Sequence, residues 1–147
     1  PNFMLRRVYA QPFEQMLALG CFCAGGVFAR HAKLRVAFLE ANCSWLPWLL
    51  WRLDEAWELD GDVWAPDVKL KPSDYFKKHC VVSIEPDEVI ANNVLEQVGN
   101  GNLVFSTDYP HVDSRYPEAV NYFLRLPFSD ADKRKILWDN CANYYAM

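Results

Sequence analysis

Apolar and polar positions change spacing along the chain, and this pattern predicts helices and strands in alternation. From Phe13 to about His31, apolar residues recur at spacings of three and four, which is typical of a buried helix. The next run, 35–40, reads Arg-Val-Ala-Phe-Leu-Glu and favours a strand of a parallel sheet that is covered on both faces. The opening segment 1–12 has neither a helix cap nor a regular period, so it predicts no element of its own.

Two later runs have the same form as this strand, apolar residues followed by an acid. They are Cys-Val-Val-Ser-Ile-Glu at 80–85 and Leu-Val-Phe-Ser-Thr-Asp at 103–108. Helices are predicted between and after the strands, at 45–59, 73–78, 86–98, 116–126 and 129–145. Asn42 or Ser44 is expected to cap the first of them, and Ser73 to open the second. A loop is predicted over 60–72. This alternation indicates an α/β fold with parallel strands joined by right-handed crossovers.

Composition narrows the class of protein. With 147 residues, 52% of them hydrophobic, the chain is expected to fill the core of one domain or of part of one. A net charge of -4 with dispersed Lys and Arg argues against nucleic-acid binding. Five cysteines without CxxC spacing predict reduced thiols in a cytoplasmic protein. The apolar stretch Met16 to Phe28 is too short for a membrane span and lacks the pattern of a signal peptide.

The candidate chemistry lies where the predicted strands end. Glu40, Glu85 and Asp108 each close a strand, and in a parallel sheet these ends lie on one side, where α/β proteins bind ligands. Asp108 is followed closely by His111, and a carboxylate with an imidazole suits a divalent metal or proton transfer. Trp45, next to the first strand end, is a candidate wall for a pocket. For each acid alone, a helix cap or a solvated surface position is the more common role, so the prediction depends on their convergence.

Other reactive side chains favour structural roles. His31 falls at a helix end, where an imidazolium complements the helix dipole. His79 precedes a strand, which places it at the amino-terminal side, away from the predicted site. Cys43 follows Glu40 and is a conceivable nucleophile, but the sequence places no histidine to activate it.

Five stretches together resemble a known family. They are Leu-Arg-Val-Ala-Phe-Leu-Glu (34–40), Ser-Trp-Leu-Pro-Trp (44–48), Trp-Arg-Leu-Asp-Glu (51–55), Phe-Ser-Thr-Asp-Tyr-Pro-His (105–111) and Lys-Arg-Lys-Ile-Leu-Trp-Asp-Asn-Cys-Ala-Asn-Tyr-Tyr (133–145). In combination they resemble the amidohydrolase superfamily, in the branch of aminocarboxymuconate-semialdehyde decarboxylase and related metal-dependent hydrolases. The likeness covers nearly the whole chain.

The resemblance implies a partial TIM (β/α)8 barrel. Because a complete barrel needs roughly 250 residues, residues 1–147 are expected to form the carboxyl-terminal portion of an amidohydrolase-like domain, with strands six to eight and their flanking helices. The His-x-His pair that the family carries on strand one has no counterpart in this sequence.

The resemblance also implies a reaction. Asp108 matches the strand-eight aspartate that binds a divalent metal, expected to be zinc, and acts as general base toward a metal-activated water. The implied enzyme is a metal-dependent hydrolase or a non-oxidative decarboxylase of a small-molecule substrate. Many relatives carry a histidine at the end of strand six, where this chain has Glu40. Glu40, Glu85, His111 and Trp45 are therefore predicted to contact the substrate or the metal's ligands.

Two alternatives remain at this stage. The first is a non-catalytic half-barrel that assembles with itself as a homo-oligomer, or with a missing amino-terminal half, because open sheet edges favour association. The second is a flavodoxin-like binding module, which the lack of a Gly-rich phosphate loop disfavours.

Overall fold

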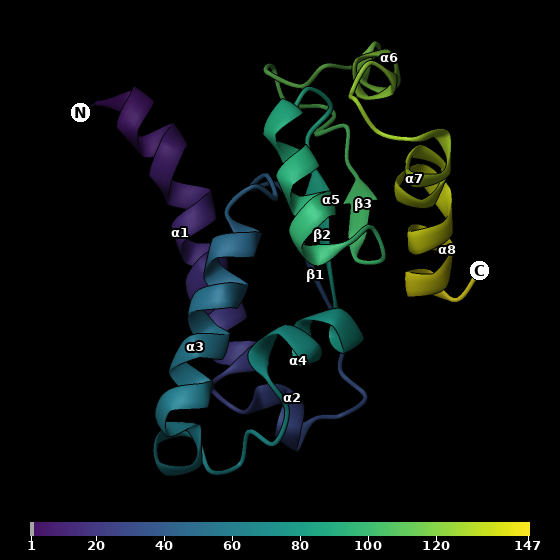
Figure 1. Ribbon diagram of the computed structural model, residues 1–147. Helices are drawn as coiled ribbons and strands as arrows, with labels where there is room; N and C mark the ends of the chain where they lie inside the picture. Colours follow the sequence, from purple (N-terminus) through teal and green to yellow (C-terminus); the bar gives the residue numbers. More distant parts are fainter. Residues whose placement is uncertain (1) are drawn as a thin grey trace. The chain divides into compact units, whose positions relative to one another are not determined.

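The computed structural model describes residues 2–147, and these fall into two compact units (Figure 1). A helical unit contains the residues up to 36 together with 45–80. A second unit, 37–44 together with 81–147, carries nearly all of the sheet. Among the residues described, no helix is both long enough and apolar enough to span a membrane.

The first helix of the helical unit, α1 (Phe3–Cys23), begins well before the predicted start at Phe13. The side chain of Asn2 caps it by accepting a hydrogen bond from the Leu5 N–H at 3.2 Å. The predicted end at His31 is also wrong, because Gly26 takes a left-handed φ of 77° and separates α1 from the short α2 (Val27–Arg30).

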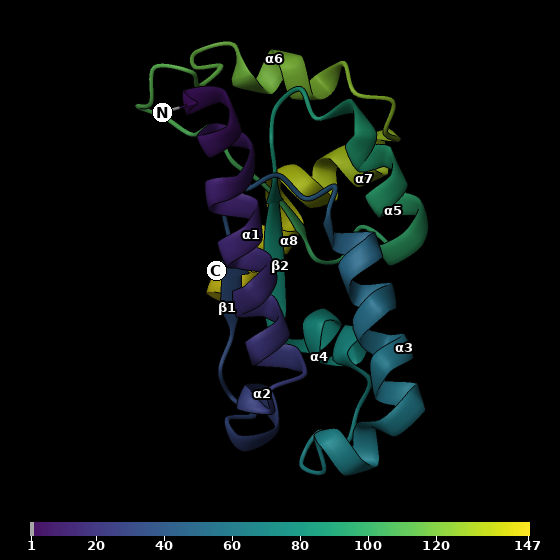
Figure 2. The same cartoon turned by 90° about the vertical axis from the view of Figure 1, so that its left-hand side faces the viewer.

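Two further helices complete this unit, α3 (Leu46–Trp64) and α4 (Pro72–His79). The predicted break after Leu59 appears as a kink at Asp60, beyond which the helix resumes to Trp64. Contacts join α4 to both α1 and α3, and Figure 2 shows α4 between them. The N–H and hydroxyl of Ser73 both donate to the Asp54 carboxylate, at 2.9 and 2.5 Å, which fixes the start of α4 against α3.

His79 belongs to the core of the helical unit. Its ring stacks on Phe28 with centroids 4.5 Å apart, and its Nδ1 lies 2.9 Å from the Leu34 carbonyl oxygen. The side chain is almost fully buried. A buried, stacked imidazole with a backbone partner is a packing residue, so the structural role predicted for His79 is confirmed.

Three strands form the sheet in the order β1-β2-β3: β1 (Val36–Phe38), β2 (Cys80–Ile84) and β3 (Leu103–Phe105). The central strand pairs with β3 in parallel, with Val82 opposite Leu103 and Ile84 opposite Phe105. All five residues of β2 are buried, as the sequence predicted for a strand covered on both faces.

The remaining helices of the second unit follow the strands. The structure gives them as η1 (Val89–Ala91), α5 (Asn92–Val98), α6 (Ala119–Leu124), α7 (Asp130–Arg134), the π-helix η2 (Lys135–Asp139) and α8 (Asn140–Tyr145). Ser129 caps α7 by accepting from the Asp132 N–H at 3.1 Å, so the predicted start is confirmed. The helix expected from Pro86 instead begins at Val89.

One buried amide joins the last helix to the sheet. Asn140 donates from Nδ2 to the carbonyl oxygens of Asn100 and Leu103, at 2.6 and 2.7 Å. Figure 1 shows α8, in yellow, alongside β3, and α6 beyond the end at which β3 finishes. This packing holds β3 in place and leaves the loop that follows it at the carboxyl end of the sheet.

Candidate metal and proton-transfer site

Two predicted acids close β1 and β3 in an unusual backbone conformation. Glu40 has φ 66° and Asp108 has φ 57°, both in the left-handed region that non-glycine residues rarely adopt. The Glu40 N–H donates to the buried Ser83 hydroxyl of β2 at 3.1 Å, which secures the strand end. Strained positions of this kind cluster at functional sites. Their occurrence at two of the three predicted acids therefore makes the carboxyl end of the sheet a candidate functional site.

His111 brings the two acids together. Its Nδ1 lies 2.8 Å from Asp108 Oδ1 and 3.3 Å from Glu40 Oε1. The backbone supports this geometry through a turn, because the His111 N–H donates to the Asp108 carbonyl at 3.0 Å. Asp108 is the most enclosed member, with 20% of its side chain exposed against 57% for His111. The structure thus assembles a carboxylate–imidazole–carboxylate cluster from residues 40, 108 and 111.

The donor atoms of this cluster suit a cation. One ligand atom from each of Glu40, Asp108 and His111 lies within 4.8 Å of the others. Two carboxylates and an imidazole are ligands that divalent Mn, Fe and Zn accept. The residues present therefore fit the divalent metal that the family resemblance implies, with three donors from this chain.

Glu85, the third predicted acid, follows β2 and responds to the same charges. Burial, followed by the negative charges of the neighbouring acids, raises the pKa of Glu85 to about 7; these acids are Asp108, Glu88, Asp87 and Glu40. Because the charges of Glu40 and Asp108 act on Glu85, the three acids lie near one another at the carboxyl end of the sheet. Its perturbed pKa is characteristic of a functional site.

Trp45 occupies the N-cap position of α3, in the helical unit. Neither Asn42 nor Ser44 provides the cap that the sequence predicted: the N-cap is Trp45, and it makes no side-chain cap hydrogen bond. The role of Trp45 as a wall of the substrate pocket stays a prediction.

Sequence reasoning missed Glu88. Its carboxylate is 7% exposed and accepts hydrogen bonds from the N–H groups of Cys43, Ser44 and Glu85. The expected helix from Pro86 placed this residue in a solvated first turn, and the run Glu-Pro-Asp-Glu carries no signal that separates its buried acid from the exposed ones. Only the folded backbone reveals which of these acids lies inside.

Cys43 is excluded as a thiolate nucleophile. Burial, reinforced by the charge and hydrogen bond of Glu88, raises the pKa of the Cys43 thiol far above its ordinary value. The thiol stays protonated and lies 3.6 Å from Glu88 Oε2 as a hydrogen-bond donor. Cys43 therefore supports the loop after β1 rather than attacking a substrate.

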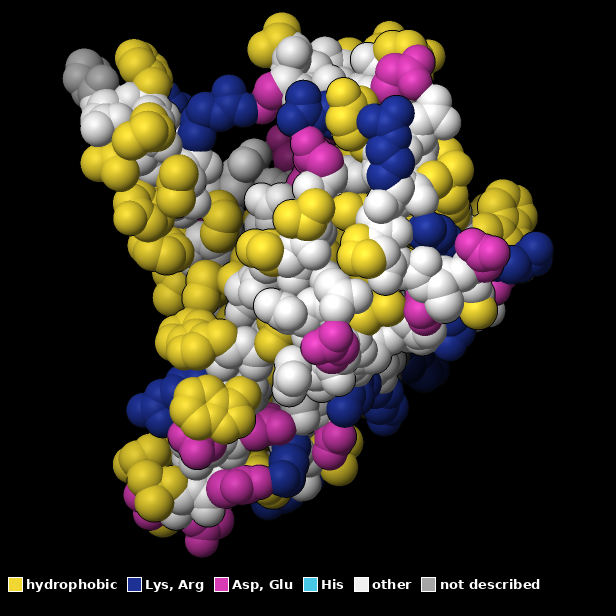
Figure 3. Space-filling view, turned by 45° about the horizontal axis from the view of Figure 1, so that its top comes forward, with side chains coloured by type: hydrophobic (Ala, Val, Ile, Leu, Met, Phe, Trp, Pro, Cys, Tyr) yellow, Lys and Arg dark blue, Asp and Glu magenta, His cyan; other side chains and the backbone are white. Residues whose placement is uncertain are grey.

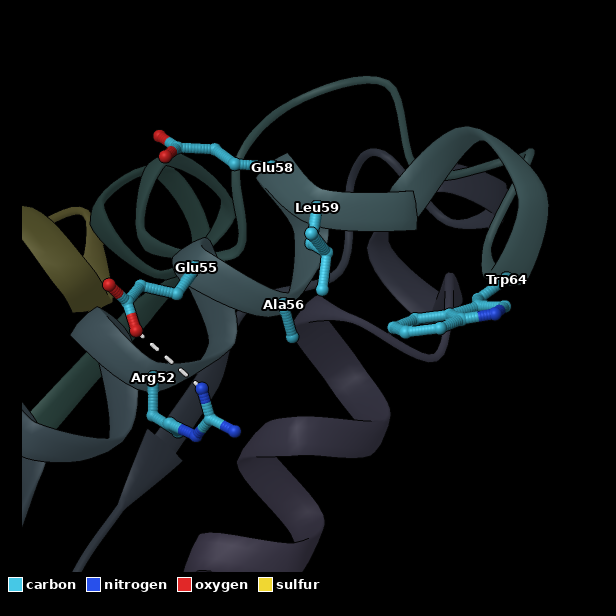
Figure 4. A pocket seen from close by; sticks show the side chains of 6 residues that line it. All are labelled: Arg52, Glu55, Ala56, Glu58, Leu59 and Trp64. Carbon is cyan, nitrogen blue, oxygen red and sulfur yellow. Dashed lines mark ion pairs between the residues drawn. The ribbon is translucent and has the colours of Figure 1, made fainter.

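The helical unit has a surface pocket of its own. A pocket of about 460 Å³ is lined by side chains of α3 alone, with Trp64 at one end and an Arg52–Glu55 ion pair of 3.5 Å at the other (Figure 4). Both members of this pair are about half exposed. A solvent-exposed ion pair contributes little free energy, so the carboxyl end of the sheet remains the better candidate.

Known proteins resemble this chain over most of its length. The family model described as amidohydrolase matches residues 11–146. A 2-amino-3-carboxymuconate-6-semialdehyde decarboxylase of Dictyostelium discoideum is 25% identical over all of this chain and 41% of its own length. A gamma-resorcylate decarboxylase of Polaromonas sp. strain JS666 is 27% identical, over 83% of this chain and 37% of its own length. The chain thus spans about two fifths of these relatives.

Solved structures show the fold. A dihydroxybenzoic acid decarboxylase from Polaromonas sp. JS666, with bound manganese and 2-nitroresorcinol, superposes with a TM-score of 0.74 at 23% identity, over 92% of this chain and 40% of its own. A 5-carboxyvanillate decarboxylase from Sphingomonas paucimobilis gives 0.71 at 23%, over 88% and 38%. These neighbours are TIM barrels, so the predicted partial (β/α)8 barrel, strands six to eight with flanking helices, is confirmed. The match across residues 11–146 also confirms the resemblance found in the sequence: the chain belongs to the amidohydrolase family.

Proposed function

We propose that this chain contributes the carboxyl-terminal part of a metal-dependent, non-oxidative decarboxylase that acts on a small, conjugated or aromatic carboxylate. The observation that carries the proposal is the Glu40–Asp108–His111 cluster, whose donor atoms lie within 4.8 Å of one another. The two curated relatives described above are named as decarboxylases, which favours loss of carbon dioxide over the hydrolysis expected from the sequence.

In this proposal Asp108 holds the metal and moves a proton, in keeping with its predicted role as ligand and general base. A bound divalent cation would act as a Lewis acid toward an oxygen of the substrate. His111, whose Nδ1 lies 2.8 Å from Asp108 Oδ1 and 3.3 Å from Glu40 Oε1, would supply the imidazole ligand, and Asp108 would exchange a proton with the substrate. Glu40 and Glu85 add negative charge at the same carboxyl end of the sheet.

Manganese and zinc are both candidates for the cation. Zinc is the expectation from the sequence, whereas the Polaromonas structure contains manganese. Carboxylate ligands suit Mn²⁺ well, and imidazole suits Zn²⁺. With two carboxylates and one imidazole supplied by this chain, we favour Mn²⁺.

The test is an assay of the full-length protein loaded with Mn²⁺ or Zn²⁺. We expect metal-dependent release of carbon dioxide from 2,6-dihydroxybenzoate or a related aryl carboxylate, and little hydrolysis of p-nitrophenyl acetate. Metal-dependent ester hydrolysis without carbon dioxide release would contradict the proposed decarboxylase and support the hydrolase predicted from the sequence. Absence of both reactions would favour the non-catalytic half-barrel.

That alternative has one supporting observation, an exposed apolar face on α1. Large apolar side chains along this helix are more than half exposed: Phe3, Met4, Val8, Phe13 and Leu17. Figure 3 shows yellow side chains following α1. A face of this kind is typical of a surface that associates, in agreement with the expected homo-oligomer or missing amino-terminal half. A complete decarboxylase barrel would bury this face of α1 too. The oligomeric state therefore does not distinguish the decarboxylase from the non-catalytic half-barrel, whereas the assay does.

A further inference from the structure

We infer that Glu88 is a positioning residue that fixes the position of Glu40 at the carboxyl end of the sheet. The inference rests on the proposed function of the Glu40–Asp108–His111 cluster. The Glu88 carboxylate accepts hydrogen bonds from the N–H groups of Cys43, Ser44 and Glu85. Its effect is exerted through the backbone of the loop 40–44, which joins β1 to α3.

The two carboxylate oxygens of Glu88 serve different segments. Oε1 accepts from the Cys43 N–H and the Ser44 N–H, both at 2.9 Å, and from the Ser44 hydroxyl at 2.6 Å. Oε2 accepts from the Glu85 N–H at 3.2 Å and faces the Cys43 thiol at 3.6 Å. One side chain therefore fastens the loop after β1 to the turn after β2.

Burial makes this fastening strong. Only 7% of Glu88 is exposed, and a carboxylate so enclosed is tolerated when donors satisfy its oxygens. Three backbone N–H groups and a hydroxyl supply those donors here. Removing the side chain would leave several buried donors without a partner, which costs more than the loss of a hydrogen bond at the surface.

The loop needs such a fastening because it holds strained backbone. Glu40 and Asn42 both have positive φ, 66° and 58°. The segment is held at its start by the bond from the Glu40 N–H to Ser83 and at its end by Glu88. Strained conformations persist where the surroundings over-determine them. Without the second attachment, the loop can relax and carry the Glu40 carboxylate away from His111.

The two oxygens also make Glu88→Gln an informative variant. A glutamine keeps the shape of the side chain but has one acceptor oxygen, and its NH₂ group would face a donor on the other side. It can serve the Cys43 and Ser44 donors or the Glu85 N–H, and not both. We therefore expect a folded protein in which the attachment between the two loops is broken.

The experiment measures amide hydrogen exchange and Mn²⁺ affinity on the 147-residue chain, for wild type, Glu88→Gln, Glu40→Gln and the double variant. Glu118→Gln is the matched control, because Glu118 is exposed and holds a hydrogen bond to Asn121. In Glu88→Gln we expect exchange of the Cys43, Ser44 or Glu85 amide to quicken by roughly tenfold, and Mn²⁺ to bind about tenfold more weakly. In the Glu40→Gln background the same change should leave Mn²⁺ affinity nearly unaltered.

Non-additivity is the signature of action through Glu40. If Glu88→Gln weakens Mn²⁺ binding by the same factor with and without Glu40, or if the three amides exchange as in wild type, the positioning role is wrong. If the amides respond as expected while the wild-type chain binds no Mn²⁺ near residue 40, the loop attachment stands and the proposed metal site fails. The two failures are therefore distinguishable.

Discussion

Replacing Asp108 by Asn is expected to lower the turnover of the full-length, Mn²⁺-loaded protein by about 100-fold or more. The amide has no negative charge for a cation and no basic oxygen to take a proton. It also replaces one carboxylate oxygen by an NH₂ group beside the His111 Nδ1, which lies 2.8 Å from Asp108 Oδ1. The measurement is the rate of carbon dioxide release, with circular dichroism to check the fold.

We expect the variant to fold, because Asn tolerates the left-handed φ of 57° that Asp108 adopts. Asp113→Asn is the control, since Asp113 is an exposed acid of the same loop. Turnover within about twofold of wild type in the Asp108 variant would remove Asp108 from the catalytic role; a similar loss in both variants would point to a general effect of charge on the loop.

Glu85→Gln is expected to stabilise the chain at pH 8 and to have a much smaller effect at pH 5. The pKa of Glu85 is raised to about 7 in the folded chain from an ordinary value of 4.5, so the folded state disfavours its charge. Its contribution to stability is fully present below about pH 4.5 and is lost as the pH rises through about 7. The neutral glutamine avoids that loss.

The size of the effect follows from the shift. One pKa unit corresponds to about 1.4 kcal/mol, but Glu85 is partly exposed and solvent screens it, so we expect on the order of 1 kcal/mol at pH 8. Urea unfolding in the presence of a chelator, at pH values from 5 to 8, measures the difference between variant and wild type. Glu14→Gln, at an exposed acid of α1, is the control and should show no such trend. A difference that stays constant with pH would show that the charge of Glu85 is not disfavoured in the folded chain.

The sequence predicted the convergence of the acids because strand ends are governed by a simple rule. Apolar runs that end in an acid place that acid at the carboxyl edge of a parallel sheet. Glu40 and Asp108 indeed meet at His111, and Glu85 shares their field. Family resemblance then gave Asp108 its expected role, which the Asp108→Asn experiment tests.

Other features depended on tertiary contacts and escaped prediction. The beginning of α1 was missed because its apolar residues lie on an exposed face and Pro12 interrupts the pattern. Ser44 was expected to cap α3, yet its hydroxyl donates to Glu88 in the folded chain. Glu88 was missed for the same reason. Its partners are residues 43 and 44, which are far away in the sequence, and local propensity does not predict such long-range contacts.

Locating bound Mn²⁺ on the 147-residue chain by paramagnetic broadening in ¹H–¹⁵N spectra tests the cation site at the strand ends most directly. Weak binding is sufficient, because broadening reports proximity even at low occupancy. We predict that amides of residues 40–44, 85–88 and 106–113 broaden first, and that Asp108→Asn removes the effect. Broadening centred on the acidic residues of α3, with 106–113 left sharp, would contradict the claim that the ends of the three strands form the cation site.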